Sequence, residues 1–398
     1  MHLNIQRLYD IAQKPKRTII GLMSGTSVDG LDIALCEITG VGTATALHLI
    51  QFKTIPYEDD FKQKVLTILS KQQIALEHLV LLNPWIGLQH ANMVKQALAD
   101  WEMNLNQIDL IASHGQTIYH APKSMHPYDE FAAATLQIGD GDHLAVQTGI
   151  ITISDFRQKH IAAGGEGAPL AMYGDYLLCS HPTENRLMLN IGGIANYTFL
   201  PAGGTLQTTI STDTGPGNTL MDALMRMYFN QPFDKDGEIA KQGQVHEQLL
   251  AALRSDDFFS VPIPKSIGQE LFNIDFFNAA LEATGTQQLS IYDLMATLNK
   301  FTAITIAEGI QKLVPKSMQY HMYTSGGGMH NQVLMEHLYN LLPNAKIQST
   351  AAIGIDPDAK EAILFALLAN EFVAGSPLYA GSYATKIPTS MGKISFPY

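Results

Sequence analysis

Three glycine-rich segments of this 398-residue chain combine backbone N–H donors with hydroxyl and carboxylate side chains. Residues 21–35, GLMSGTSVDGLDIAL, place small, polar and turn-forming residues between two apolar runs. Residues 186–200, RLMLNIGGIANYTFL, repeat this pattern about 170 residues later, and residues 321–342 contain three glycines before a helical pattern. Because glycine turns and helix N-termini orient N–H groups toward anions, the segments predict a polyphosphate site. Their spacing is neither that of a Walker P-loop nor that of GxGxxG.

Carboxylates beside these turns offer two further kinds of chemistry. Asp29 and Asp32 flank Gly30 and carry the oxygen ligands that Mg²⁺ prefers, although capping of a turn is the commoner role of such residues. Asp213 precedes a Gly-Pro-Gly turn. There a carboxylate serves either the turn itself or, in a kinase, as the general base that takes a proton from the nucleophile. Glu361, early in the last helical pattern, is either an ordinary surface residue or a residue of the site.

Three basic or imidazole side chains are candidates for binding an anion. Arg157 and Lys265 suit a phosphate or a substrate carboxylate, while a single basic residue is usually a solvated surface group. His114 is open to a structural role as a hydrogen-bonded histidine. The residue types alone leave both interpretations in place.

Strand and helix patterns alternate along the chain, which predicts an α/β fold. The two glycine hairpins predict two similarly built lobes facing one cleft, with chance similarity as the alternative. We expect helices over residues 57–82, over residues 83–101 from an Asn-Pro start, and over residues 356–372 from an Asp-Pro start. The tail from Ala374 is expected to be irregular.

Composition excludes several classes of function. A formal net charge of −12 argues against nucleic-acid binding. Two cysteines, Cys36 and Cys179, supply neither a disulfide framework nor a thiolate zinc site. The N-terminus lacks the apolar core of a signal peptide, and the apolar run at residues 362–369 is too short to span a bilayer. We therefore expect a cytoplasmic protein that binds no nucleic acid and no membrane.

Taken in order, the motifs resemble those of one family. GLMSGTSVDGLDIAL, SHGQTIYH, LQIGDG, DFR with AAGGEGAPL, LNIGGIAN, DTGPGNTLMDA, SGGG and GID are similar to the motifs of the 1,6-anhydro-N-acetylmuramic acid kinases, over residues 19–372. The resemblance implies the two-lobed, ribonuclease H-like α/β fold of actin and hexokinase, with mixed sheets flanked by helices and a nucleotide cleft. It implies one lobe of residues 1–150 with 373–398, and a second lobe of residues 151–372.

The resemblance also implies a reaction, which belongs to peptidoglycan recycling. The 1,6-anhydro ring of the sugar is hydrolysed, and the freed 6-oxygen takes the γ-phosphoryl group of ATP. By resemblance, Asp213 is the general base, Glu361 is a second catalytic carboxylate, and Asp29 and Asp32 hold magnesium through water. The implied nucleotide-binding positions are Gly25, Thr26, Ser27, Val28, Asp29, Gly30, Leu31, Asp32, Gly192, Gly193, Asn196, Gly326, Gly327, Gly328 and Asn331. The implied sugar-binding positions are His114, Arg157, Gly165, Glu166 and Gly167. The family suggests a homodimer.

The chain departs from the family pattern at several positions. Gln158, Lys159 and His160 stand where many members have further arginine and then aspartate, and Glu166 replaces a glutamine. Ile267 replaces the threonine of a lysine-serine-threonine-glycine motif, and the tail lacks the usual ending. Two alternatives therefore stay open. One is a kinase of another amino sugar or sugar acid, and the other is a non-catalytic protein driven by nucleotide-dependent conformational change.

Overall fold

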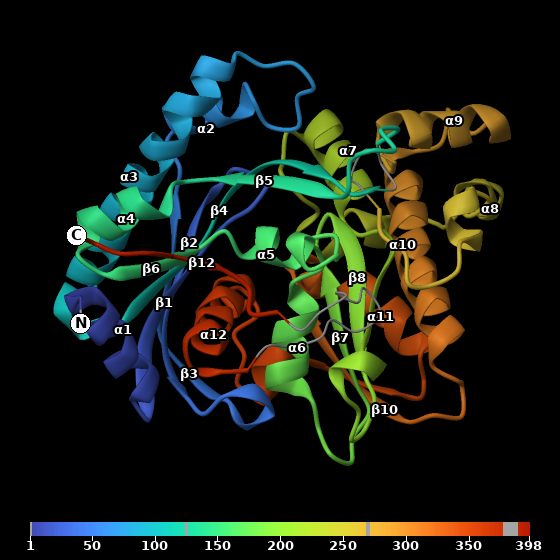
Figure 1. The fold of residues 1–398 in the computed structure, drawn as a ribbon. Helices are drawn as coiled ribbons and strands as arrows, with labels where there is room; N and C mark the ends of the chain where they lie inside the picture. The colour runs from blue at the N-terminus through green and yellow to red at the C-terminus, as the bar shows by residue number, and fades with distance from the viewer. Residues whose placement is uncertain (1, 124–125, 268–270, 377–388) are drawn as a thin grey trace. The chain divides into compact units, whose positions relative to one another are not determined.

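The computed structural model describes residues 2–123, 126–267, 271–376 and 389–398 (Figure 1). The chain forms two compact units, one made of Met1–Leu178 with Ala359–Tyr398 and the other of Cys179–Asp358. Each unit contains one β-sheet and its own helices.

The first unit contains one large sheet. Its strands are β1 (Lys16–Ser24), β2 (Gly30–Thr39), β3 (Ala46–Pro56), β4 (Leu110–Ala121), β5 (Ala134–Ile138), β6 (Ile151–Ser154) and β12 (Lys393–Ser395). Its helices are α1 (Leu3–Gln13), α2 (Asp59–Leu66), α3 (Leu76–Asp100), α4 (Gly141–Thr148), α5 (Phe156–Ala162), α6 (Ala171–Cys179) and α12 (Lys360–Ala374).

The second unit contains the smaller sheet. Its strands are β7 (Arg186–Ile191), β8 (Ile194–Leu200), β9 (Ile210–Pro216), β10 (Tyr320–Ser325) and β11 (Ala345–Ser349). Its helices are α7 (Thr219–Phe229), α8 (Glu247–Leu253), α9 (Ile274–Thr284), α10 (Ile291–Leu313) and α11 (Gln332–Leu341), and a 3₁₀ turn, η8 (Gly327–His330), precedes α11.

The unit boundaries correct the lobes expected from sequence. Residues 151–178 and 359–372, assigned there to the second lobe, belong to the first unit. The reason is strand pairing and packing, because β6 pairs with β4 in the first sheet and α12 packs on β1 and β2. A sequence signal for a linker is absent at either boundary.

The two sheets share one strand order. It is β12-β6-β4-β1-β2-β3 in the first unit, with β5 on β4, and β11-β10-β7-β8-β9 in the second. In each, the first three strands form an antiparallel meander, and the next two strands of the core run parallel to the first. Each glycine hairpin is therefore the first turn of a meander, at the carboxyl end of a central parallel strand. The expectation of two similarly built α/β units is confirmed.

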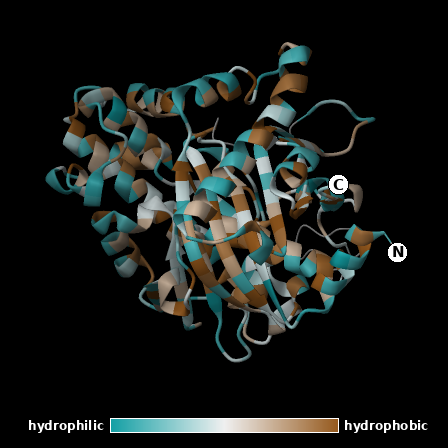
Figure 2. Ribbon diagram, turned by 90° about the vertical axis from the view of Figure 1, so that its left-hand side faces the viewer, coloured by the Kyte–Doolittle hydropathy of each residue, from teal (hydrophilic) through white to brown (hydrophobic). Residues whose placement is uncertain are grey.

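The central strands are buried on both faces, as is typical of parallel strands covered by helices. In β1, Ile20 and Leu22 belong to the core that contains Ile86 of α3, while Gly21 on the other face meets α12. Every residue of α12 from 362 to 371 is buried, and Figure 2 shows hydrophobic residues concentrated along the strands. Among the described residues, none of the helices combines the length and apolar character that crossing a bilayer requires.

The helix expected over residues 57–82 is wrong in its extent. The chain forms α2, then turns over residues 67–75, and then α3, which runs through Pro84. A proline inside a helix frees backbone groups of the preceding turn. Next to Pro84, the Asn83 carbonyl accepts from the N–H of Asp140 at 3.1 Å, and the Asn83 side chain accepts from the N–H of Gly139 at 2.9 Å. The Asn-Pro pair is thus a docking point for the loop before α4 rather than a helix start.

The C-terminal part differs from expectation at two places. α12 begins at Lys360 because the Asp356 carboxylate accepts from the N–H of Asp358 at 2.9 Å, and so caps a turn that precedes the helix. The tail contains β12, which pairs antiparallel with β6 at the edge of the sheet. Residues 377–388 of the tail lie outside the described residues.

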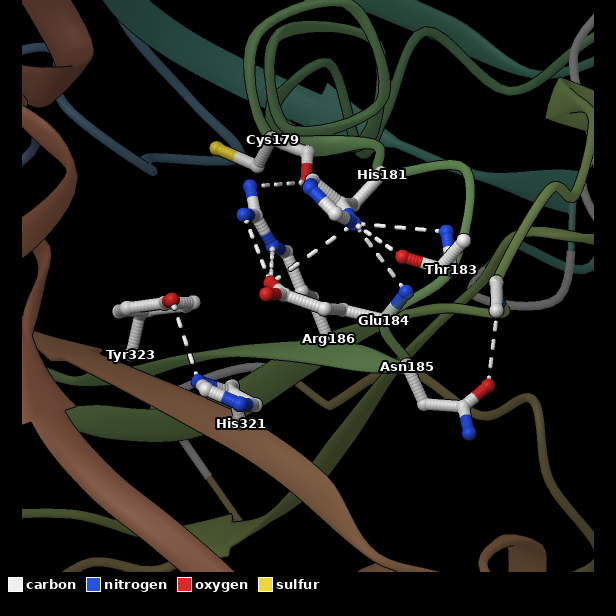
Figure 3. Close-up of polar contacts among 9 residues, drawn as sticks. Cys179, His181, Thr183, Glu184, Asn185, Arg186, His321 and Tyr323 are labelled. Carbon is white, nitrogen blue, oxygen red and sulfur yellow. Dashed lines mark hydrogen bonds and ion pairs between the residues drawn. The ribbon is translucent and has the colours of Figure 1, made fainter.

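A polar cluster joins the start of β7 to β10 (Figure 3). Arg186 Nε and Nη2 donate to Glu184 Oε2 at 3.0 and 2.8 Å, and Arg186 Nη1 donates to the Cys179 carbonyl at 3.1 Å. The Arg186 guanidinium lies 5.6 Å from the centroid of the Tyr323 ring, and Arg186 pairs in register with His321. The cluster holds these strands together at the end remote from the glycine turns.

Candidate active site

The first glycine turn links β1 to β2. Val28 adopts a left-handed backbone (φ 53°), which β-branched residues rarely take, and its side chain is buried in the core. Asp29 Oδ1 accepts from the Ser27 hydroxyl at 2.7 Å and from the Gly30 N–H at 3.0 Å. Within the described residues, the N–H groups of Thr26 and Ser27 have no acceptor. The turn therefore has a fixed shape and offers backbone donors, as an anion site requires.

Carboxylates gather beside this turn. Asp32 accepts from the Thr54 hydroxyl at 2.6 Å. Desolvation raises the pKa of Glu361, the charge of Arg157 opposes the rise, and Asp32 and Asp29 add to it. In the part of the chain that the structure describes, no three His, Cys, Asp or Glu side chains are arranged to hold a metal. Asp29 and Asp32 therefore fit a magnesium ion held through water and phosphate, not an all-protein cage.

Close backbone packing places Glu361 near this turn. A Cβ on Gly21 would lie 1.9 Å from the carbonyl oxygen of Ala362, so only glycine lets α12 approach β1 this closely. Glu361 lies in the first turn of α12, where part of its side chain reaches solvent while neighbouring protein groups crowd and desolvate its carboxyl group. Leu31, at the start of β2, is fully buried and supports the turn from the core.

Two neutral acceptors hold Arg157 of α5. Its Nε donates to His114 Nε2 at 2.9 Å, and its Nη1 donates to the Gly167 carbonyl at 2.8 Å. His114 Nδ1 donates in turn to the Gly115 carbonyl at 2.8 Å, so the imidazole is neutral and protonated at Nδ1. Burial, reinforced by the charge of Arg157, lowers the pKa of His114 to about 3. The guanidinium keeps its positive charge beside Glu361 and is able to pair with an anion.

His160 supports the same loop through the other polar group of Gly167. Its Nδ1 accepts from the Gly167 N–H at 2.9 Å, while Arg157 takes the carbonyl. A Cβ on Gly165 would lie 2.2 Å from the His160 ring, which explains the glycine. Burial lowers the pKa of His160 to about 4, so the ring stays a neutral acceptor. Glu166 lies half-buried between the two glycines. The five predicted sugar-binding residues are thus brought together in the first unit.

In the second unit, the glycine turn after β7 meets the Gly-Pro-Gly turn by backbone contact. The Gly192 carbonyl accepts from the N–H of Asn218, and the Gly193 carbonyl accepts from the N–H of Gly217, both at 2.8 Å. A Cβ on Gly217 would lie 2.2 Å from the Gly192 carbonyl oxygen. These two turns therefore require glycine at position 217 in order to pack.

The third glycine segment packs on the same turn. A Cβ on Gly326 (φ 81°) would lie 2.7 Å from both the Asn190 side-chain oxygen and the Ile191 carbonyl oxygen. A Cβ on Gly328 would lie 2.3 Å from the Ile191 side chain, whereas Gly327 has no such close neighbour. The structure thus brings the second and third predicted nucleotide segments together at the carboxyl ends of β7 and β10.

Asp213 lies in β9 opposite Asn196 of β8. Its Oδ2 accepts from the Ile267 N–H at 2.8 Å, and its own N–H donates to the Lys265 carbonyl at 2.9 Å. Burial raises the pKa of Asp213 to about 6, although the Ile267 N–H and the charge of Lys265 both lower it. A fixed carboxylate with a pKa near 6 is well matched to accepting a proton near neutral pH.

Lys265 itself is buried. Its Nζ donates to the Phe258 carbonyl at 2.6 Å and lies 3.8 Å from the centroid of the Phe258 ring. Burial lowers the pKa of Lys265 to about 8. These contacts make Lys265 a support for the segment that holds Asp213.

Asn331 caps α11. Its Oδ1 accepts from the Leu334 N–H at 3.1 Å and from Asn299 Nδ2 at 3.0 Å. Helix capping accounts for asparagine at position 331, and a contact between Asn331 and the nucleotide stays a prediction. Sequence reasoning did not single out Asn218 or Gln116, although both stand inside the motifs GPGN and SHGQ.

A hollow of about 370 Å³ lies beside the third glycine segment, between α11 and strands β10 and β11. Its lining side chains include Met329, Met335, Tyr339, Ile347, Gln332 and Gln348. A mostly apolar lining with a few polar side chains is typical of small-molecule sites in general.

Known proteins match the chain over its length. A family model described as anhydro-N-acetylmuramic acid kinase matches residues 17–396. Proteins named anhydro-N-acetylmuramic acid kinase from Pseudoalteromonas atlantica and Pseudoalteromonas translucida are 52% and 53% identical, with 100% of each chain covered. One from Caldanaerobacter subterraneus is 37% identical and covers 98% of this chain and 100% of its own.

Among solved structures, a hexokinase from Schistosoma mansoni complexed with glucose matches 90% of this chain and 86% of its own, with 10% identity and a TM-score of 0.41. The sequence matches reach from the first strand to the last, and they include every glycine segment described above. The chain therefore belongs to the anhydro-N-acetylmuramic acid kinase family.

Proposed function

We propose that this chain uses ATP to open 1,6-anhydro-N-acetylmuramic acid and to phosphorylate its 6-oxygen. Water adds to the anomeric carbon and gives its proton to Asp213, and the bond from that carbon to the bridging oxygen breaks. The bridging oxygen stays on carbon 6, attacks the γ-phosphorus and displaces ADP. The products are N-acetylmuramic acid 6-phosphate and ADP.

Asp213 carries this proposal as the general base. Its pKa of about 6 leaves it ionised at neutral pH yet basic enough to take a proton, and the Ile267 N–H holds one oxygen in place. Water is a poor nucleophile, so a carboxylate base is the usual device for hydrolysis at an anomeric carbon. Glu361 is proposed to orient the sugar and the water.

Arg157 is proposed to bind the carboxylate of the sugar acid. Its protein partners, His114 and the Gly167 carbonyl, are neutral, so they orient the guanidinium without neutralising it. A planar guanidinium suits a carboxylate because it donates two parallel hydrogen bonds. Gly165 and Gly167 are proposed to let the loop backbone approach the sugar.

The glycine turns are proposed to hold ATP. Backbone N–H groups of Thr26, Ser27 and Gly193 suit the phosphates, with Gly192 shaping the second turn through its own hydrogen bond to the Ile194 carbonyl, and the hollow beside residues 326–328 suits the adenine. Asp29 and Asp32 would hold magnesium through water. When bound, the metal supplies charge neutralisation on the β- and γ-phosphates.

Family resemblance supports three further proposals: a role in peptidoglycan recycling, a cytoplasmic location and a homodimer.

The test is to identify the product in oxygen-18 water. We expect the phosphorylated sugar to gain one heavy oxygen at the anomeric position, with none in the phosphoryl group, in a mass spectrum of the fragmented product. Phosphorylation of an amino sugar without a carboxylate at a higher rate, which the extra negative charge of Glu166 would favour, would replace the substrate and keep the phosphoryl transfer. Heavy oxygen in free phosphate, indifferent to added sugar, would indicate a nucleotide-driven protein and reject the proposal.

A further inference from the structure

Four side chains form a hydrogen-bonded chain beneath the first glycine turn. The Tyr57 hydroxyl donates to the Ser24 hydroxyl at 2.7 Å, and the Ser24 hydroxyl donates to Gln116 Oε1 at 2.6 Å. Gln116 Nε2 donates to the carbonyl of Gly25, within the turn, at 3.0 Å. At the other end, His90 Nε2 lies 2.9 Å from the Tyr57 hydroxyl. All four side chains are buried, at 3% exposure or less.

The backbone at one end of this chain determines its direction. Gln116 Nε2 lies against two carbonyls, those of Gly25 at 3.0 Å and Thr117 at 3.2 Å. Carbonyl oxygens only accept, so the Gln116 amide must turn its NH₂ group toward them and its oxygen toward Ser24. Ser24 has a single proton to donate, and it donates that proton to Gln116.

The remaining donors follow by elimination. Because Ser24 has spent its proton, its oxygen accepts from Tyr57, and Tyr57 has no proton left for His90. His90 must therefore donate through Nε2–H. Burial lowers the pKa of His90 to about 4, so the ring carries one proton at neutral pH. That leaves His90 Nδ1 as a bare acceptor, and within the described residues it has no partner.

Two residues of the hydrogen-bonded chain, Gln116 and Tyr57, anchor the two ends of the glycine turn. Gln116 holds the Gly25 carbonyl, which also accepts from the Val28 N–H at 3.3 Å, and the backbone N–H of Tyr57 donates to the Asp29 carbonyl at 2.9 Å. With two carbonyls of the turn fastened to the core, the N–H groups of residues 26 and 27 are left to an external anion.

We propose that Gln116 is a positioning residue for the nucleotide phosphates, oriented by the one-way chain His90–Tyr57–Ser24 and acting through the Gly25 carbonyl. The proposal rests on the assignment of this turn to ATP. The proposal does not require Gln116 to contact the phosphates directly. The cost of a wrong orientation is an unpaired buried polar group next to the turn.

The test replaces each of two glutamines by glutamate and compares the affinities of the two variants for Mg-ATP. Q116E removes the donors that face the Gly25 carbonyl and keeps the shape of the side chain. Q137E is the matched control, because Gln137 lies on the adjacent strand β5 and donates only to Thr135 and Thr117 hydroxyls. We expect the dissociation constant of Mg-ATP, measured by calorimetry, to rise roughly ten-fold or more in Q116E, as for loss of a buried hydrogen bond. We expect less than about a two-fold change in Q137E and in the KM of Q116E for the sugar.

Y57F tests the orienting chain without touching the turn's own hydrogen bond to Gln116. It should weaken Mg-ATP binding in the same direction but by less, and its effect should vanish in the Q116E background. An unchanged affinity for Mg-ATP in a folded Q116E protein overturns the proposal, and so does an equal loss in Q137E. If the wild-type chain binds Mg-ATP yet phosphorylates no anhydro sugar, the proposed function fails while this comparison still decides the role of Gln116.

A measurement on the unaltered protein guards against a variant that fails to fold. The ¹⁵N chemical shifts of the His90 ring should show a neutral imidazole protonated at Nε2 at pH 7. A ring protonated at Nδ1 would reverse the hydrogen bond to Tyr57 and overturn the proposed direction.

Discussion

The two glycine hairpins occupy the same place in sheets of the same strand order, yet different contacts support their turns. Beneath the first turn, the side chains of Gln116 and Ser24 carry the contacts, and the Cβ position of Gly25 has no protein atom closer than 3.6 Å. At the second turn, backbone meets backbone, and a Cβ on Gly217 would lie 2.2 Å from the Gly192 carbonyl oxygen.

This difference teaches that similar topology does not imply similar sensitivity to substitution. The first turn depends on donor and acceptor chemistry, so a change of shape is tolerated and a change of polarity is not. The second turn depends on the absence of side chains, so an added side chain is not tolerated there, whatever its polarity. A second difference concerns chemistry, because only the second hairpin places a carboxylate with a raised pKa, Asp213, on the neighbouring strand opposite Asn196.

The largest effect is expected at Asp213. Asn at this position keeps an oxygen for the Ile267 N–H but removes the base, so D213N should lower kcat by at least about a hundred-fold with little change in Mg-ATP affinity. The wild-type kcat should fall as the pH drops through about 6, where Asp213 gains its proton, and this limb should be missing in D213N. Near-normal turnover in D213N would contradict the assignment of the base.

The next effect separates the two turns directly. An added methyl group at Gly217 must displace the Gly192 carbonyl, at a cost of about 1–3 kcal/mol, so G217A should weaken Mg-ATP binding roughly ten-fold or more. G25A meets only the Ser27 hydroxyl, at an ordinary contact distance of 3.6 Å, and should weaken Mg-ATP binding less than about three-fold. Calorimetry on both variants, with melting temperatures to confirm folding, checks the contrast. Equal losses would show that the two turns are supported in the same way.

A smaller effect is expected at the sugar-binding loop. His160 Nδ1 accepts from the Gly167 N–H, and the side-chain oxygen of asparagine falls near the same place. H160L should raise the KM for the sugar by roughly five-fold, in line with one lost hydrogen bond, while H160N should restore most of it. Steady-state kinetics with the sugar and with ATP varied separately test this. A rise in the KM for ATP instead would place His160 with the nucleotide.

The smallest effect concerns acid stability of the first unit. His90, His114 and His160 are buried there, and burial lowers their pKa values from 6.5 to about 4, 3 and 4. A histidine whose folded pKa is lowered contributes stability above its unfolded value, and that stability is lost as the pH falls from 6.5 toward 4. Urea unfolding should therefore show a falling free energy across this window. H90Q, which keeps an N–H donor but does not titrate, should flatten the fall.

Much of this architecture was predictable from local patterns. The glycine hairpins, the helical pattern after residues 326–328 and the α/β class follow from periodicity and turn residues, since these signals are short-range. The course of α3 through Pro84 was not, because the Asn83 carbonyl and side chain beside the proline find partners in a loop more than fifty residues away. β3 was missed because it is an edge strand with few buried residues.

The candidate site divides in the same way. Residue type and motif singled out Asp213, Arg157 and the glycines. The chain that supports the first turn escaped notice, because Tyr57 and His90 stand in unremarkable sequence and acquire their roles only by meeting Ser24 in the folded core.

The close packing of α12 against Gly21 of β1 has a mechanical consequence. Where a strand and a helix touch through backbone alone, no side chain is present to yield, so neither element slides against the other without breaking main-chain packing. The helix that carries Glu361 and the strand that leads into the first glycine turn therefore move as one rigid body. Whatever rearrangement accompanies a catalytic cycle, the spacing between them is carried along unchanged, and an enlarged residue at position 21 would reset it permanently.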